Sequence, residues 1–310
     1  MNHDLYSFFF DSKQKIVRWD EVEKVNVISL TQIDLLALYL AEDERKGREK
    51  LRYIMKSGRL TRDLELHDEQ LSRLGLKIPR IELLKIPQGS HVIQIAFRLK
   101  KPYISLDDES FYIVDNPLVK DTVFKIPMIR PSTWKGALRW VVRSALGRSR
   151  AIVERLFGNE KEAEHAKQGR LIFYATFLDR VSLDVITPLR RETRTPRRGP
   201  ILFEIAPAGS RGMFSLLYIP FDLLHILRSG DSMAKARAMD EIKEDIETLK
   251  EAIPAMFTTY GFAAKKTSGY GVAEDEIDFR LDSMEMKAKN FDEFKKQMES
   301  LVMNLGGTRE

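Results

Sequence analysis

The sequence predicts an α+β fold in which a helical N-terminal extension, residues 1–88, precedes a larger domain, residues 89–310. Two observations predict it. Apolar residues recur at helical spacing before residue 88, whereas strict alternation of apolar and polar residues begins just after residue 89. From residue 91 onward the expected elements then follow the order strand, helix, strand, strand, helix, strand, which is the ferredoxin-like βαββαβ pattern.

The extension is expected to hold two helical stretches. One starts at Thr31, a residue type that caps helices, and stops near Gly58. The second covers residues 61–74 and carries apolar residues at helical spacing. Pro87 and Gly89 then mark a linker, since these two residue types punctuate regular structure.

The first half of the core domain is predicted from periodicity and helix-boundary signals. Residues 91–99 (HVIQIAFRL) alternate as a half-buried strand does, and residues 170–178 (RLIFYATFL) are also rich in strand-forming residues. Between them, a helix is expected to begin at Pro131-Ser132-Thr133 and to stop at Gly147.

The second half supplies the remaining elements, in which a helix from residue 232 is expected to end or kink at Pro254. The other expected segments are strands at residues 201–205, 213–219 and 272–281, a glycine-bracketed loop at 261–271 and an amphipathic helix from Phe291 to Val302. The same βαββαβ topology serves the RNA-recognition motif, so this core is compatible with RNA binding without establishing it.

Composition excludes several classes of function. The chain of 310 residues has no cysteine, which removes disulfides, cysteine-ligated zinc and thiol nucleophiles. No stretch approaches 18 apolar residues, and the acidic first 20 residues lack a cleavage site, so neither a membrane span nor a secretion signal is expected. A cytoplasmic location follows. The net charge of +5 is a weak indication of a nucleic-acid partner.

The helix entry at Pro131 is the most informative stretch. Ser132 or Thr133 is expected to act as the N-cap, which leaves the amides of the first turn pointing outward with partial positive charge, as in a phosphate-binding site. Lys135, Arg139 and Arg143 are four residues apart and share one face. The alternative is an ordinary amphipathic helix with a solvated basic face.

Gly136 is unusual because a glycine in the first turn of a helix costs about 1 kcal/mol of helix propensity relative to alanine. We expect that another backbone approaches the helix closely at this position. We also expect the helix entry and the C-terminal glycine loop to lie on the same side of the sheet.

The glycine loop contains residues suited to binding a nucleotide chain, because glycine lets backbone approach phosphates and lysine adds charge. Tyr270 is a candidate for stacking on a base. The candidate RNA-binding residues of the loop are Lys265, Lys266, Gly269, Tyr270 and Gly271. Alone, such a loop is often only a turn between a helix and a strand.

Residues 189–200 concentrate positive charge against the single Glu192. Crowding of like charges is unfavourable unless an anion is present, which favours contact with an RNA backbone. The alternative is a solvated loop. The arginines concerned are Arg190, Arg191, Arg194, Arg197 and Arg198.

Several of these stretches resemble motifs of the RAMP superfamily, the repeat-associated proteins of CRISPR systems. Pro131–Arg139 (PSTWKGALR) is similar to that family's Pro-Gly-Ser-Ser-Leu-Lys-Gly helix entry, although the glycine before the serines is absent. Val114–Asp121 (VDNPLVKD) resembles the Asp-x-Pro segment of backbone subunits of type III effectors. Residues 156–158, 204–210 and 261–271 resemble further family motifs, so that the resemblance covers about residues 91–281.

The resemblance implies a prokaryotic subunit that binds CRISPR guide RNA and target RNA. It also implies partner subunits: a large polymerase-like subunit, small subunits and other RAMP subunits. A thumb hairpin is implied at about residues 184–204, and the arginines of residues 189–200 would lie on it. Asp115 matches the aspartate that cleaves target RNA with help from a divalent metal, Mg²⁺ or Mn²⁺.

Other interpretations remain open. Asp115 also suits a turn with Asn116-Pro117, and the acids at residues 107–109 suit either a second metal ligand or a solvated loop. If Asp115 only forms a turn, the chain is expected to be a non-catalytic structural or capping subunit of the same complex. A processing endoribonuclease would use a histidine, among which His165 is the best candidate. A last alternative is a ferredoxin-like protein that binds a small ligand or another protein.

Overall fold

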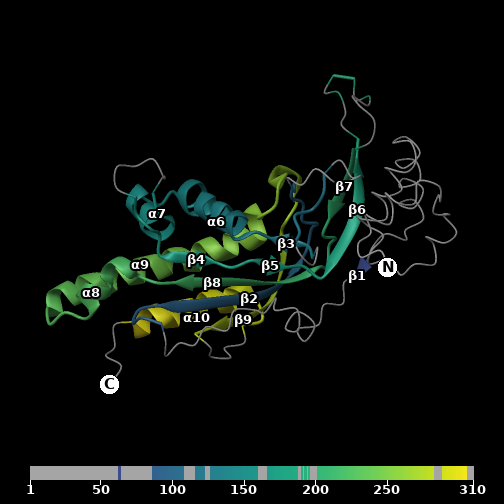
Figure 1. Ribbon diagram of the computed structural model, residues 1–310. Helices are drawn as coiled ribbons and strands as arrows, with labels where there is room; N and C mark the ends of the chain where they lie inside the picture. Colours follow the sequence, from purple (N-terminus) through teal and green to yellow (C-terminus); the bar gives the residue numbers. More distant parts are fainter. Residues whose placement is uncertain are drawn as a thin grey trace, which may run out of the picture.

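The computed structural model has a mixed α and β architecture, as the sequence predicts, with antiparallel sheets and several helices (Figure 1). The residues that the structure describes are 62–63, 86–107, 116–122, 126–159, 166–187, 190, 192–193, 195, 201–282 and 288–305.

The strands within this described part are β1 (Arg62–Asp63), β2 (His91–Leu99), β3 (Met128–Ile129), β4 (Leu171–Phe173), β5 (Thr176–Phe177), β6 (Arg180–Ile186), β7 (Ile201–Ile205), β8 (Arg211–Tyr218) and β9 (Ala273–Leu281). The α-helices there are α6 (Pro131–Trp140), α7 (Arg150–Phe157), α8 (Leu224–Leu227), α9 (Ser232–Ala255) and α10 (Phe291–Asn304). Two π-helical turns, η3 (Val141–Ala145) and η5 (Met256–Tyr260), continue α6 and α9, and the 3-10 turns are η4 (Phe221–Leu223) and η6 (Lys266–Ser268).

The main sheet has four strands in the order β4-β8-β2-β9, and all neighbours are antiparallel. The strands β8 and β2 are central, so Ile93 of β2 lies opposite Leu216 on one side and Leu281 on the other. Along the chain α6 connects β2 towards β4, and α9 connects β8 to β9. Both connections therefore pass through helices that pack on the sheet.

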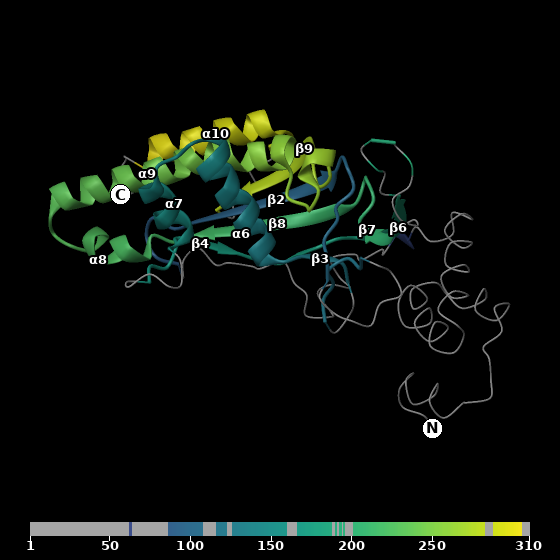
Figure 2. The same ribbon diagram turned by 90° about the horizontal axis from the view of Figure 1, so that it is seen from above.

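The core lies between one face of this sheet and the helices. Alternate residues of β2 point into it, because successive side chains of a strand face opposite sides. Trp134 of α6 is fully buried there, with its ring 4.9 Å from that of Phe214 and 5.5 Å from that of Phe257. Helix α10 closes the β9 end, where Phe294 meets Phe279. Figure 2 shows α6, α9 and α10 lying along the sheet.

The strands β6 and β7 form an antiparallel hairpin that belongs to a second sheet, of order β1-β6-β7. The pair runs from Ser182 opposite Ile205 to Ile186 opposite Ile201. Figures 1 and 2 place this hairpin at the end of the molecule opposite α8. The short pair β3 and β5 lies beside the main sheet at the same end.

Several elements differ from the prediction. Residues 170–178 split into β4 and β5 because the two pieces pair with different strands, β8 and β3. Strand β6 was missed as an element, although its polar and apolar residues alternate from Arg180 to Val185. Arg62 and Asp63 were expected in a helix but form β1, which pairs with β6. The rest of the predicted helices before residue 86 lies outside the described residues.

The helix was expected to end or kink at Pro254; α9 includes Pro254 and ends one residue later, at Ala255, where the π-helical turn η5 continues it. Proline cannot donate the usual hydrogen bond, and the following turn is π-helical rather than α-helical. The hydroxyl of Thr258 donates to the Pro254 carbonyl at 2.9 Å. The helical backbone stops only at Gly261, whose φ of 72° favours glycine.

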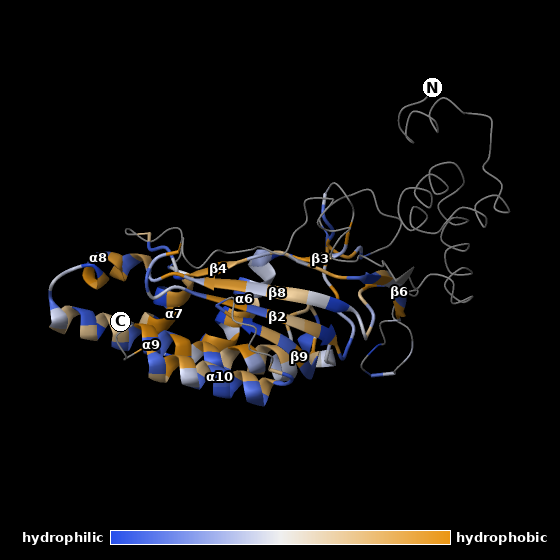
Figure 3. Cartoon of the chain, turned by 90° about the horizontal axis from the view of Figure 1, so that it is seen from below, coloured by the Kyte–Doolittle hydropathy of each residue, from blue (hydrophilic) through white to orange (hydrophobic). Residues whose placement is uncertain are grey.

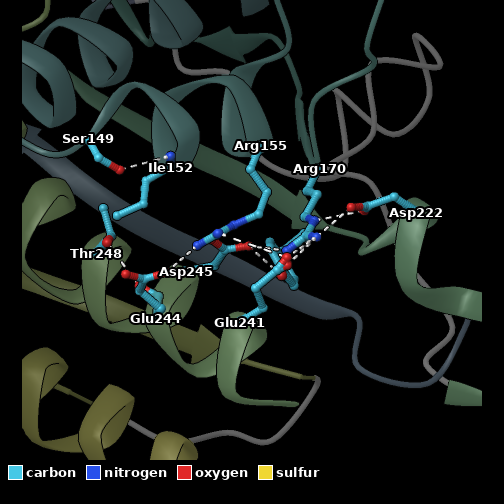
Figure 4. A network of polar contacts seen from close by, with 10 residues as sticks. Ser149, Ile152, Arg155, Arg170, Asp222, Glu241, Glu244, Asp245 and Thr248 are labelled. Atoms are coloured by element: carbon cyan, nitrogen blue, oxygen red, sulfur yellow. Dashed lines mark hydrogen bonds and ion pairs between the residues drawn. The ribbon is translucent and has the colours of Figure 1, made fainter. Parts of the chain in front are cut away.

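A buried polar network ties α7, β4, β8 and α9 together (Figure 4). The carboxylate of Asp245, fully buried on α9, accepts hydrogen bonds from Arg155 at 2.7 Å, from Arg170 at 2.8 Å and from the Tyr218 hydroxyl at 2.8 Å. Arg170 also donates to Asp222 at 2.8 Å. The buried Arg170 and the partly buried Arg155 are therefore both compensated by carboxylates of the same chain.

The surfaces of the helices follow the expected amphipathic pattern. Figure 3 shows hydrophilic and hydrophobic residues alternating along α9 and α10. The buried residues of α10 are Phe291, Phe294 and Met298, which are spaced by three and four residues. Among the described helices, none is both long and apolar enough to cross a membrane.

Candidate nucleic-acid interface

A short segment after β2 joins all the parts of the candidate interface. The backbone of Tyr103 exchanges hydrogen bonds with Ala206, which follows β7, at 2.9 and 3.0 Å. The Ile104 carbonyl accepts from the Ala264 amide in the glycine loop at 3.1 Å. Burial raises the pKa of Tyr103 to about 12, although hydrogen bonds of its hydroxyl with Ser105 and Thr133 oppose this rise. Residues 103–105 therefore connect the hairpin base, the glycine loop and the entry of α6.

The segment that follows Asp115 is attached to the same place. The side-chain amide of Asn116 donates to the Ser105 carbonyl at 2.7 Å, and the Val119 amide donates to the Ser105 hydroxyl at 3.0 Å. The Pro117 carbonyl accepts from the amide of Asp107 at 3.0 Å. Asp115 itself lies outside the described residues, but the residue next to it is held firmly.

Glu204 is a residue whose role sequence reasoning missed, having quoted it only within a family motif. Its buried carboxylate accepts from the Leu118 amide at 3.0 Å and forms an ion pair with Lys120. Its own amide donates to the Asn116 carbonyl at 2.9 Å. Glu204 thus anchors the segment after Asp115 to β7. The available signal was an acidic residue in the middle of an apolar strand.

The prediction that Ser132 or Thr133 caps α6 is wrong. The N-cap is Arg130, which makes no side-chain cap hydrogen bond, and Pro131 takes the first helical position. Proline suits that position because its fixed φ is already helical. The Thr133 amide donates to the Arg130 carbonyl at 3.0 Å, and proline has no amide hydrogen. The helix entry therefore offers an anion fewer free amides than expected.

The residues of the expected basic face are divided between α6, which holds Lys135 and Arg139, and the π-helical turn η3, which holds Arg143. Lys135 and Arg143 are exposed and Arg139 is half-buried. Partial burial, aided by the charge of Arg139, lowers the pKa of Lys135. Within the described part of the chain, none of the three forms an ion pair with a carboxylate.

Gly136 is exposed, and a Cβ built on it would meet no protein atom within 4 Å. The close backbone approach that the sequence predicts is therefore not made by any described residue of this chain. The glycine leaves an open strip of helix backbone between Lys135 and Arg139.

Within the loop at residues 261–271, glycine is required at different positions for different reasons. A Cβ on Gly271 would lie 2.6 Å from the Ala263 nitrogen, and one on Gly261 would lie 2.8 Å from the Tyr270 oxygen. These two glycines let the two ends of the loop touch. Gly269 has a φ of 80° but open space around it, so its requirement is backbone conformation alone.

Two lysines place the glycine loop between the helix and the hairpin. The ammonium of Lys266 lies 5.5 Å above the ring of Trp140 on α6, and that of Lys265 lies 5.4 Å above the ring of Phe203 on β7. The helix entry and the loop thus lie on the same side, as expected. Burial lowers the pKa of Lys266, and burial raises that of the half-buried Tyr270.

The arginine stretch follows β6, and of its five arginines only Arg190 is described. It is exposed, and its amide donates to the Thr195 carbonyl at 2.8 Å. The arginines that lie outside the described residues are Arg191, Arg194, Arg197 and Arg198. Their contact with RNA stays a prediction.

The acids and histidines give little support to other chemistry. Asp107 is not part of a solvated loop, because it is buried and pairs with Arg130 at 3.1 Å. No cluster of three potential metal ligands occurs among the residues that the structure describes. His91 is buried, pairs with Asp282 at 2.7 Å and begins β2 at the end far from the interface. His225 is exposed on α8, and His165 is not described.

Comparison with known proteins places these features in a class. The family model of the RAMP superfamily matches residues 57–274, and the chain belongs to that superfamily. This confirms the resemblance predicted from the helix entry and the glycine loop. The match begins at residue 57, before the residue 91 at which the resemblance was expected to start.

Individual relatives are more specific. Over 172 residues the chain is 24% identical to the "CRISPR system Cms endoribonuclease Csm3" of Streptococcus thermophilus. The aligned region covers 51% of this chain and 73% of that protein. The chain also superimposes on a chain of the type III-B Cmr-beta complex bound to cognate target RNA, with a TM-score of 0.51, 15% identity and coverage of 90% and 89%. The chain thus resembles backbone subunits of type III CRISPR effectors.

Proposed function

We propose that this chain is a guide-RNA-binding subunit of a type III CRISPR effector complex. One observation carries the proposal: the glycine loop contacts α6 through Lys266 and Trp140, and these elements together with η3 carry five cations that form no ion pair within the described residues. They are Lys135, Arg139, Arg143, Lys265 and Lys266. A polyanion compensates such a group at no cost to the fold.

The arrangement of the main sheet supports the proposal. Its order β4-β8-β2-β9, with α6 and α9 in the connections, is the order expected for the ferredoxin-like core that we propose. In this core the α6 entry and the glycine loop before β9 come to the same end of the sheet. The β6–β7 hairpin rises from that end and would serve as the thumb near the RNA.

The test is binding of the full chain to single-stranded RNA over a range of salt concentrations. We expect log Kd to rise with log salt with a slope of about 0.7 per phosphate contacted. A matched control is Lys243→Ala, since Lys243 on α9 pairs with Asp240 and lies outside the basic group. Binding that is absent, or that has no salt dependence, would contradict the proposal.

We further propose that Asp115 takes part in cleavage of target RNA, with partner subunits completing the complex. The 2′-oxygen would attack the adjacent phosphorus while the bond from phosphorus to the 5′-oxygen breaks, giving a 2′,3′-cyclic phosphate and a 5′-hydroxyl. The hydroxyl proton leaves the nucleophile and the departing oxygen gains one. A bound Mg²⁺ or Mn²⁺ would stabilise charge on the phosphate. The proposal is supported by the anchoring of Asn116, the residue that follows Asp115, to Ser105 and Glu204.

The assembled complex provides the test of cleavage. Asp115→Ala should abolish cutting of bound target, a 2′-deoxy nucleotide at the cut position should do the same, and guide binding should remain. If cleavage is unchanged in Asp115→Ala, the chain is a non-catalytic or capping subunit and the RNA-binding proposal still stands. A lone chain that cuts a repeat hairpin would instead indicate a processing enzyme.

A further inference from the structure

An exposed aromatic pair lies inside the basic group. Trp140 at the end of α6 is 44% exposed and Tyr260 at the end of η5 is 36% exposed. Their ring centroids are 5.2 Å apart at an interplanar angle of 66°. Trp134, six residues earlier on the same helix, is fully buried. The two tryptophans of this helix therefore differ: Trp134 belongs to the core and Trp140 to the surface.

Three features around the pair point to its ligand. Lys266 lies 5.5 Å above the Trp140 ring. Gly136, one helical turn before Trp140, leaves the helix backbone open on that side. Arg139 and Arg143 flank the same stretch and form no ion pair within the described residues. An exposed aromatic pair with a cation against one ring, beside an accessible backbone, suits a flat aromatic group that carries a phosphate.

We propose that Trp140 and Tyr260 form a stacking surface for a nucleobase of the bound single strand, and that Lys266 contacts its phosphate. This inference rests on the proposed function and adds a contact to it. Base stacking on aromatic side chains tolerates any sequence, because every base has a π-face. Such a contact would hold the guide without reading it, which a subunit that must accept every guide requires.

The stacking and ionic contributions differ in their response to salt. Trp140→Ala and Tyr260→Ala should each weaken binding of single-stranded RNA by the full chain by about fivefold to a hundredfold, while the salt slope stays the same. Lys266→Ala should instead lower the slope by about 0.7. Trp140→Phe and Tyr260→Phe keep a ring and should restore most of the affinity. The matched control is Phe221→Ala, because Phe221 is 40% exposed but lies on η4 beside α8.

A second measurement detects the contact directly. In a Trp19→Phe background, only Trp134 and Trp140 remain, and RNA should quench the fluorescence of the exposed one. An RNA with abasic positions should bind without this quenching. Absence of quenching, or unchanged affinity of Trp140→Ala, would overturn the stacking inference while leaving the RNA-binding proposal intact. Unchanged RNA affinity together with lost assembly of the complex would assign the pair to a protein contact instead.

Discussion

Two groups of cations in this molecule have opposite surroundings. Arg155 and Arg170 are directed inward and meet the carboxylate of Asp245, with Asp222 completing the network (Figure 4). Lys135 and Lys266 lie at the surface beside other cations and meet no carboxylate among the described residues. The positive charge of the first group is compensated by carboxylates of the fold itself. The positive charge of the second group is available for compensation by a bound anion. The comparison separates cations that stabilise the fold from cations that we propose bind RNA.

The largest expected effect concerns the balanced group. Asp245→Ala leaves two guanidinium groups without their buried carboxylate, so we expect a loss of about 3–5 kcal/mol in the free energy of unfolding, measured by urea denaturation. Tyr218→Phe removes only one donor and should cost about 1 kcal/mol. If Asp245→Ala does not fold, Asp245→Asn, which keeps an acceptor oxygen, replaces it. A loss below that of Tyr218→Phe would contradict this account.

The next effect concerns the unbalanced group. Lys135→Ala should change the free energy of unfolding by less than about 0.5 kcal/mol, because no partner is left behind. The same variant should weaken RNA binding about fivefold near 0.1 M salt and lower the salt slope by about 0.7. Arg139→Ala should behave alike. A Lys135→Ala protein with normal affinity but reduced stability would reverse the assignment.

Gly136 allows stability and binding to be separated in one residue. Because an added Cβ meets open space, Gly136→Ala should raise the free energy of unfolding by about 1 kcal/mol. If RNA approaches the helix at this point, the methyl group should also weaken binding. Thermal unfolding and RNA titration of the same preparation check both parts. Higher stability with unchanged affinity would show that RNA does not contact Gly136.

The smallest effect is on pH dependence. Burial and neighbouring Arg139 hold the pKa of Lys135 below its ordinary value of 10.5, and burial lowers that of Lys266. In the free protein these lysines therefore lose their protons at a lower pH than ordinary lysines, while a bound phosphate favours the charged form. Affinity for an adenine-only RNA should fall as the pH rises towards 10.5. In Lys135→Arg the fall should be shallower, since arginine keeps its charge.

The sequence predicted best where one face of an element decides its structure. Strand β2 was found with its bounds because its alternate residues enter the core, and α9 because Ile242, Ile246 and Leu249 form one stripe. Strand β6 was missed although Arg180–Val185 alternate as a strand does, so in this case the sequence signal was present and was not used. The cap at Ser132 failed because the helix starts at Pro131, so its N-cap is Arg130, two residues earlier.

The candidate site was predictable in its cations and not in its scaffold. Lys135, Lys265 and Lys266 lie in recognisable motifs, so the sequence alone identifies them as candidate RNA-binding residues. The roles of Tyr103 and Glu204 depend on contacts between residues far apart in the sequence. Tyr103 contacts Thr133, and its neighbour Ile104 contacts Ala264, about 160 positions away. Glu204 contacts Leu118. No local pattern encodes those distances.

The π-helical turns η3 and η5 carry an evolutionary consequence. Each holds one residue more than an α-helical turn of the same span, η3 directly after Trp140 and η5 ending at Tyr260. Deleting a single residue from η5 would give back an α-helical turn of about the same span, so the residue that ends it would keep about the same direction. The π-helical turn therefore accommodates a one-residue difference in chain length without redirecting Tyr260.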